Sequence, residues 1–174
     1  MPDRAQVVVA DADTQRFLDA FRRIVQALRL AERRAQGVAG ISAAQLFVLR
    51  AIEPAGAALD LRALAERTCT HHSSVSVVVQ RLVERRLVTR RRAAHDARRV
   101  LVALTAAGRR VLVSAPAAPQ ERLIAHLAAR PLPTRRRLAS EMERLAAAVG
   151  AASTPAPMFF AEESAPGRAA RRRG

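Results

Sequence analysis

The chain has 174 residues, half of them hydrophobic, and a formal net charge of +15 in which every residue of the lysine and arginine class is arginine. This length suits a single domain with a sizeable core, and the apolar content excludes disorder throughout. One cysteine leaves no disulfide framework within the chain, and the N-terminus has no basic start followed by a long apolar run. We therefore expect a cytoplasmic protein without a membrane span.

Most of the positive charge lies in one part of the chain. Residues 61–110 contain twelve arginines against Glu66, Glu84 and Asp96, so this segment carries +9 of the net charge. Such a focused excess indicates a surface that binds a polyanion. No basic amphipathic helix with bulky aromatic residues supports a membrane surface as the alternative partner.

The N-terminal part predicts a leader and one long helix. Residues 1–12 are predicted to be a flexible leader, and the helix spans residues 13–36 with Asp13 or Thr14 as its cap. Its apolar residues recur at spacings of four and three, and they are Phe17, Phe21, Ile24, Leu28 and Ala31. Packing on the chain's own core would explain this seam, but the length of the helix favours a second subunit. Gly37 and Gly40 are predicted to end the helix.

The segment over residues 42–105 predicts a winged module. Ser42 is expected to cap a helix that residues 54–56 end, and residues 57–59 make a minimal strand. Asp60 then caps a short helix over residues 61–68.

A second helix of this module follows, with Thr70 or His71 as its cap. Its buried stripe is expected at three- and four-residue steps, on Val75, Val78, Val79 and Leu82. After Arg86 the period changes to two, which predicts strands over residues 88–90 and 100–104 around an arginine-rich loop. Helix, turn, helix, strand, loop and strand in this order form a winged helix-turn-helix.

The C-terminal part, residues 105–149, predicts further helices. Prolines at 116 and 119 interrupt the first, and prolines at 131 and 133 make a turn before a last helix over residues 134–149. That helix has a second apolar seam, formed by Leu138, Met142, Leu145 and Val149. Residues 150–174 are a basic, Pro- and Ala-rich tail, in which residues 158–160 are an apolar island that can dock on the chain or on a partner.

The predicted fold class is mainly α with a small β wing. A winged helix-turn-helix core is flanked by N- and C-terminal dimerisation helices, over residues 13–36 and 105–149. The two apolar seams lie on these flanking helices, so a homodimer is expected.

Three motifs give the chain a resemblance to a known family. They are SSVSVVVQRLVERRLV over residues 73–88, Asp96-Ala97-Arg98, and LTAAG over residues 104–108. With the flanking helices they make residues 14–149 similar to the MarR-type regulators, which are dimeric, ligand-responsive bacterial DNA-binding proteins. The resemblance implies a homodimer on double-stranded DNA, whose terminal helices set the distance between two winged modules. The chain departs from the family at Arg86, where glycine is usual, and at Cys69, where glycine is common.

The exposed face of the second module helix supplies the candidates for base recognition. These are His72, Ser73, Ser76, Val77, Gln80 and Arg81. Polar side chains can exchange hydrogen bonds with base edges, and a valine can meet a thymine methyl group. Arg81 can donate to a phosphate or to guanine, and a surface pair with Glu84 is the equal alternative.

The wing supplies a second set of candidates, namely Arg90, Arg91, Arg92, Asp96, Arg98 and Arg99. Asp96 can orient the guanidinium of Arg98 toward a narrow minor groove, although the two can also form a solvated turn pair of negligible energy. The other arginines are expected to contact phosphates, which gives affinity without sequence information.

The effector that the resemblance implies would bind between the dimerisation helices and the winged module. The candidate residues are Phe17, Phe21, Phe47 and Arg50, and ordinary core packing is the alternative for each. The expected ligand is a small aromatic or apolar anion, with Arg50 as its charge partner.

Cys69 is a candidate redox switch, because a thiol near a helix N-terminus can be activated; a small buried turn residue is the simpler interpretation. His71 and His72 beside it diverge on a helix, so neither a metal nor a cofactor is expected. The chain has no nucleophile-elbow motif (GxSxG), no metalloprotease motif (HExxH) and no nucleotide-binding motif (P-loop or GxGxxG), so we do not expect an enzyme.

These features together predict a sequence-specific transcriptional regulator. It is expected to act as a repressor that binds a palindromic operator as a homodimer and is released by a small ligand. Two alternatives stay open: a sequence-independent architectural DNA-binding protein, and a redox-responsive regulator acting through Cys69. The charge focused on residues 61–110 argues against an adaptor that uses the winged fold without DNA.

Overall fold

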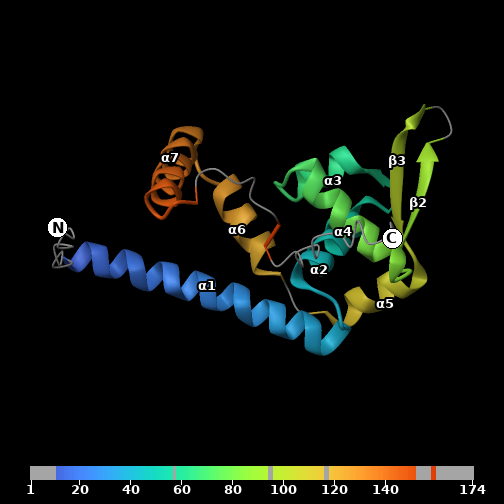
Figure 1. Cartoon of the computed structure of the whole chain (residues 1–174), viewed down its shortest axis with the longest axis horizontal. Coiled ribbons are helices and arrows are strands. Elements are labelled where there is room, and N and C mark those ends of the chain that lie inside the picture. Colours follow the sequence, from blue (N-terminus) through green and yellow to red (C-terminus); the bar gives the residue numbers. More distant parts are fainter. Residues whose placement is uncertain (1–10, 57, 94–95, 116–117, 152–157, 160–174) are drawn as a thin grey trace, which may run out of the picture.

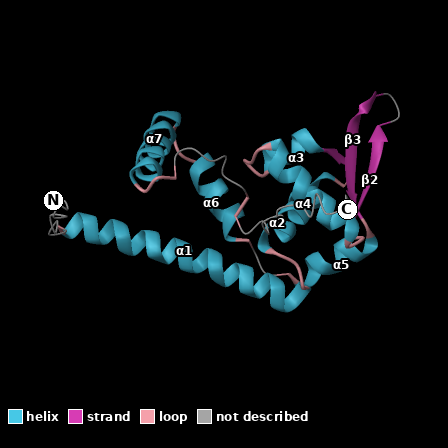
Figure 2. Cartoon of the chain, in the orientation of Figure 1, coloured by secondary structure: helices cyan, strands magenta, loops and turns pink. Residues whose placement is uncertain are grey.

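The computed structural model describes residues 11–56, 58–93, 96–115, 118–151 and 158–159, without the side chains of residues 38–39 and 96–98. The elements, in chain order, are α1 (Ala12–Ala39), α2 (Ala43–Ile52), a 3-10 turn (Glu53–Ala55), β1 (Leu59–Asp60), α3 (Leu61–Arg67), α4 (His72–Glu84), β2 (Val88–Ala93), β3 (Asp96–Leu104), α5 (Ala106–Ser114), α6 (Pro119–Ala128) and α7 (Leu132–Ala148). The fold is mainly α with a small β wing, as the sequence predicts (Figure 2).

The three strands form one antiparallel sheet in the order β1-β3-β2. Arg90 is opposite Val102 and Arg91 is opposite Leu101 in the register of β2 and β3. Because successive side chains of a strand point to opposite faces, Arg90 shares the face of the buried Val102, and Arg91 lies on the other face. The wing therefore presents its arginines in two directions.

The core lies inside the winged module, between α2, α3, α4 and the base of the wing. The predicted stripe of α4 is confirmed, since Val75, Val78, Val79 and Leu82 are all buried. They pack in one cluster with α2 residues such as Leu49. Burying this stripe turns the opposite face of α4 toward solvent, and that face is where the predicted base readers lie.

The helix α1 begins earlier and ends later than predicted. Asp11, not Asp13 or Thr14, is the N-cap, because its side chain accepts a hydrogen bond from the Thr14 N–H at 2.7 Å. Gly37 does not break the helix, and the end comes at Gly40, whose φ of 61° is left-handed. A glycine inside a helix costs only about 1 kcal/mol, so the 28-residue helix continues through Gly37.

Both departures from the family pattern fall on left-handed backbone. Cys69, with φ 49°, and Arg86, with φ 57°, are the non-glycine residues of positive φ in the described chain. Each follows a helix in the paired hydrogen-bond pattern of a Schellman end: Arg86 N–H donates to the Val83 carbonyl at 2.8 Å and Leu87 N–H to the Leu82 carbonyl at 2.9 Å. The turn geometry normally supplied by glycine is thus kept at a conformational cost.

The wing strands extend further than predicted. Arg91 and Arg92 belong to β2, and Asp96, Arg98 and Arg99 belong to β3, rather than to a loop. The reason is that this end of the ribbon extends past the core, so its sequence has no apolar alternation although the backbone pairing continues.

The predicted break near Pro116 and Pro119 is confirmed, since α5 ends at Ser114 and α6 begins at Pro119. The last helix begins at Leu132 rather than at 134, because its first turn tolerates Pro133. Of the tail, Met158 is 3% exposed and belongs to the core cluster, so this residue of the apolar island docks on its own chain. Phe160 lies outside the described residues.

The long helix α1 extends from the winged module, and α6 and α7 lie on the side away from the wing (Figure 1). The N-terminal half of α1 exposes Phe17, Phe21 and Ile24, and α7 has no buried residue among its seventeen. Among the described helices, none is long and apolar enough to cross a membrane.

Candidate nucleic-acid interface

The exposed face of α4 borders a hollow at the base of the wing. Its lining consists of Ser76, Val77, Gln80, Arg81, Glu84 and Arg90. Four predicted base readers and one wing arginine therefore lie together. The Gln80 side chain donates from Nε2 to Glu84 Oε1 at 3.1 Å, which holds the amide while its oxygen stays available to a base. Val77 is 41% exposed, so its methyl groups can meet a thymine methyl.

A second hollow adjoins the first and shares Ser76 and Arg90 with it. It is lined by Asp60, Leu61, Arg62, His72, Ser76, Arg90, Arg99 and Val100, from β1, α3, α4, β2 and β3. Arg62 was missed as a site residue in the sequence, where its only signal was membership of the charged segment. Ser73 is exposed on α4 but lines neither hollow.

Asp60 joins the helix-turn-helix to the wing through its two carboxylate oxygens. Oδ1 accepts from the Ala63 N–H at 2.7 Å and so caps α3, while Oδ2 accepts from Arg99 Nε at 3.1 Å. The Ala63 N–H and then the Arg99 guanidinium hold the pKa of Asp60 below its usual range. The carboxylate is therefore ionised at neutral pH, and it fixes Arg99 at the wall of the second hollow.

The outer wing carries the remaining predicted contacts. Arg91 and Arg92 are exposed on opposite faces of β2, and Arg90 lies closest to α4. The side chains of Asp96 and Arg98 lie outside the described residues, so their proposed pairing stays a prediction.

The LTAAG motif fixes the wing to the rest of the module. Thr105 caps α5 by accepting from the Gly108 N–H at 3.0 Å, and its hydroxyl donates to the Leu87 carbonyl, also at 3.0 Å. A Cβ at position 108 would collide with that carbonyl oxygen and lie 3.3 Å from Leu104 Cδ2. Glycine is therefore needed where α5 passes directly over the turn between α4 and β2.

The predicted effector residues do not come together within one chain. Phe47 is buried in the core, and Arg50 donates to the Ala115 carbonyl at 2.8 Å and lies 3.9 Å from Glu121 Oε1. Burial raises the pKa of Glu121, although Arg50 opposes this effect. Phe17 and Phe21 stack with ring centroids 6.3 Å apart on the exposed half of α1.

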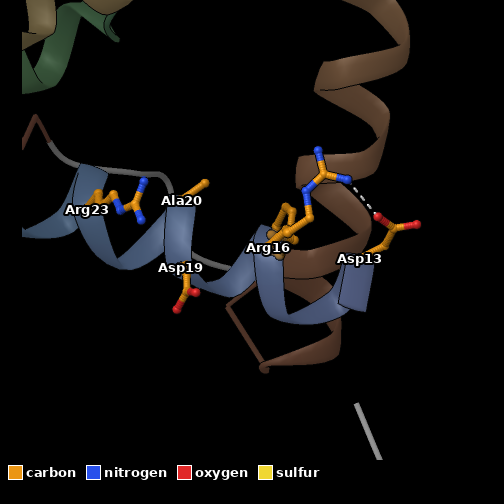
Figure 3. A pocket seen from close by; sticks show the side chains of 6 residues that line it. Asp13, Arg16, Asp19, Ala20 and Arg23 are labelled. Carbon is orange, nitrogen blue, oxygen red and sulfur yellow. Dashed lines mark hydrogen bonds and ion pairs between the residues drawn. The ribbon is translucent and has the colours of Figure 1, made fainter. Parts of the chain in front are cut away.

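The described residues that line the hollow beside Phe17 all belong to α1, and an ion pair joins Arg16 to Asp13 at one end of this lining (Figure 3). Further along the helix Leu28 and Ala35 are buried, and Ala35 belongs to the core cluster. The aromatic pair thus lies about 10 Å or more along α1 from these buried residues, at 1.5 Å per residue.

Cys69 is exposed in the turn between α3 and α4, so the interpretation as a buried turn residue is wrong. It lines a shallow surface hollow with Arg62, Glu66, Thr70, His71 and His72.

Comparison with known proteins supports the assignment of a winged helix-turn-helix to this part of the chain. A sequence model of the MarR family matches residues 39–99, while no curated protein matches the chain. The PcaV transcriptional regulator from Streptomyces coelicolor, solved with its natural ligand, is 28% identical, with a TM-score of 0.50 over 75% of this chain and 91% of that chain.

Two further solved structures show the same fold. The transcriptional regulator BldR from Sulfolobus solfataricus is 20% identical, with a TM-score of 0.51 over 78% of this chain and 96% of that one. BpsR from Bordetella bronchiseptica, whose DNA binding is regulated by 6-hydroxynicotinic acid, is 23% identical, with a TM-score of 0.50 over 75% and 98%. Residues 39–99 are therefore similar to the MarR family, and the chain shares the winged-helix fold of these solved transcriptional regulators.

Proposed function

We propose that this protein is a repressor that binds a palindromic operator as a homodimer and leaves it when a small ligand binds. The observation that carries the proposal is the pair of adjoining hollows, which places the exposed face of α4 beside cations of α3 and of the wing. A helix fits the major groove, and phosphates border that groove on both sides. MarR-family proteins are transcription regulators rather than enzymes, and we propose no catalytic role.

The roles within this surface follow from the chemistry of the side chains. Gln80 and Ser76 are proposed to read base edges, and Val77 to contact a thymine methyl. Arg81, Arg90 and the outer wing arginines are proposed to bind phosphates, with Arg98 entering the minor groove.

A second copy of the chain is the proposed cover for the apolar seams of α1 and α7. Phe21 is 44% exposed, and Leu138 and Met142 are 44% and 50% exposed. Contiguous apolar surface of this kind marks an interaction site in a stable protein. Light scattering should give twice the chain mass of 18.9 kDa. Replacing Leu138 and Met142 together by glutamate should give a monomer or an aggregate, whereas a well-folded monomer of the intact protein would contradict the homodimer.

The proposed effector is a small aromatic or apolar anion, and PcaV, which was solved with its natural ligand, supports a ligand-responsive mechanism. Arg50 is the proposed charge partner, because it is held half-buried beside Phe47 on α2. A ligand carboxylate would then compete with the Ala115 carbonyl for its guanidinium. Aromatic carboxylates should raise the melting temperature and release DNA. If none does either, the trigger lies elsewhere, and oxidation of Cys69 becomes the next candidate to test.

Selection of random duplexes by the purified protein tests the central proposal. A palindromic consensus is expected, with half-sites separated by about one helical turn. Similar affinity for selected and scrambled duplexes would favour an architectural DNA-binding protein instead.

Two single variants then test the wing. Arg98→Ala should cost about 1–3 kcal/mol on the selected duplex and reduce the salt slope by about one phosphate contact. Asp96→Ala should cost less, because it only frees the guanidinium. If Arg98→Ala binds the selected duplex with the same affinity as the wild type, this wing residue does not contact DNA.

A further inference from the structure

The second hollow at the base of the wing has a chemistry that the base-reading face does not explain. Arg62, Arg90 and Arg99 reach it from α3, β2 and β3, so the helix-turn-helix and both long strands of the wing contribute a cation. Among the described residues that line it, the one acid is Asp60, which caps α3 and is a partner of Arg99. The lining therefore keeps a positive excess, and it faces solvent.

The three arginines supply the kind of donor that a phosphate accepts. A guanidinium has five N–H donors in a planar fork, and Asp60 orients the guanidinium of Arg99 through two of them. Arg62 pairs with Glu66 at 3.1 Å, but both side chains are largely exposed, so this pair contributes little and can be exchanged for another anion. His72 and Ser76, one turn apart on α4, add ring N–H and hydroxyl donors to the same wall.

We propose that this hollow is a seat for one phosphodiester of the DNA backbone, and that Arg62 is a DNA contact of the protein. The proposal rests on the proposed function, because it takes the exposed face of α4 as the base-reading face. Ser76 and Arg90 line both hollows, so a phosphate in the seat would directly border the base pairs that Val77 and Gln80 meet. His72 is then a phosphate contact rather than a base reader.

The arrangement gives the seat a positioning role. Asp60 caps α3 and also holds Arg99 of β3 by a hydrogen bond. The wing and the helix-turn-helix therefore contact the same phosphate from two sides. Phosphate contacts carry no sequence information, but they fix the register of a recognition helix on the duplex.

The test compares Arg62→Ala with two controls in titrations at several salt concentrations. Arg110→Ala removes an equal charge from an exposed site on α5, and Glu66→Ala frees Arg62 from its surface pair without removing a cation. Between 50 and 200 mM salt, wild type should lose about 3.5-fold more affinity than Arg62→Ala, which is the salt dependence of one phosphate contact. Arg110→Ala and Glu66→Ala should each show the same salt dependence as wild type.

Duplexes with a single neutral methylphosphonate locate the phosphate. At one position in each half-site, the substitution should weaken wild type and leave Arg62→Ala unchanged, because the variant has already lost that contact. The seat would be overturned if Arg62→Ala kept the salt dependence of wild type. It would also be overturned if a methylphosphonate weakened the binding of both proteins equally at every position. A scrambled duplex separates the two proposals: equal affinity for it refutes sequence-specific repression, while the salt dependence measured on it still tests the seat.

Discussion

The left-handed backbone at Arg86 allows a sharp test of how the recognition helix ends. A non-glycine residue in this region costs about 1–2 kcal/mol, and glycine removes that cost. Glycine also gives the unfolded chain more conformational freedom, and this destabilises the folded variant by about 0.4–1 kcal/mol. Because the two Schellman hydrogen bonds come from the backbone and survive the change, Arg86→Gly should stabilise the fold by about 0.5–1 kcal/mol.

The measurement is urea unfolding at fixed protein concentration, since dimerisation makes apparent stability depend on concentration. The midpoint should rise with an unchanged slope, and a scan should show a rise of about 1–4 °C. Arg86→Ala is the matched control, because it removes the same side chain but keeps a Cβ at φ 57°. Equal free energies of unfolding for the glycine and alanine variants would refute the reasoning, since their difference isolates the backbone.

Three further predictions concern the module and its surface. Gly108→Ala should destabilise the fold by about 1–3 kcal/mol, because its Cβ meets the Leu87 carbonyl, whereas Ala106→Gly on the exposed first turn should cost at most about 1 kcal/mol; equal costs in chemical denaturation would argue against the clash. Gln80→Ala should relax discrimination at particular base pairs without changing the salt slope, and unchanged preference in a repeated selection would remove it from the base readers. Asp60→Asn keeps the cap of α3 but removes the negative charge. Because folding lowers the pKa of Asp60, the ionised carboxylate stabilises the fold fully at pH values well above its unfolded pKa of about 3.9. This stabilisation is lost as the pH falls through the folded pKa. The stability gap between wild type and Asp60→Asn should thus close in acid, and a gap that is constant with pH would count against the ion pair.

Local patterns in the sequence determined the elements of the winged module. The three- and four-residue steps of Val75, Val78, Val79 and Leu82 gave the buried face of α4, because a helix that packs on one side must repeat with its own period. Caps at Ser42 and Asp60 were readable for the same reason: their hydrogen bonds join residues only three apart. The exposed recognition face followed from these assignments, since it is the side of α4 opposite the stripe.

What the sequence did not reveal depends on backbone pairing or on contacts between residues distant along the chain. The length of the wing was missed, because its outer half pairs through the backbone and has no apolar alternation. Arg62 gave no signal of a site, since only the packing of α3 against α4 and the sheet brings it to Arg90 and Arg99. Asp60 was recognised as a cap, but its second partner, Arg99, lies 39 residues away. Periodicity and capping act within one or two turns of the backbone, whereas the shared phosphate seat and the wing–helix junction exist only once β1, α3, α4 and the wing pack together.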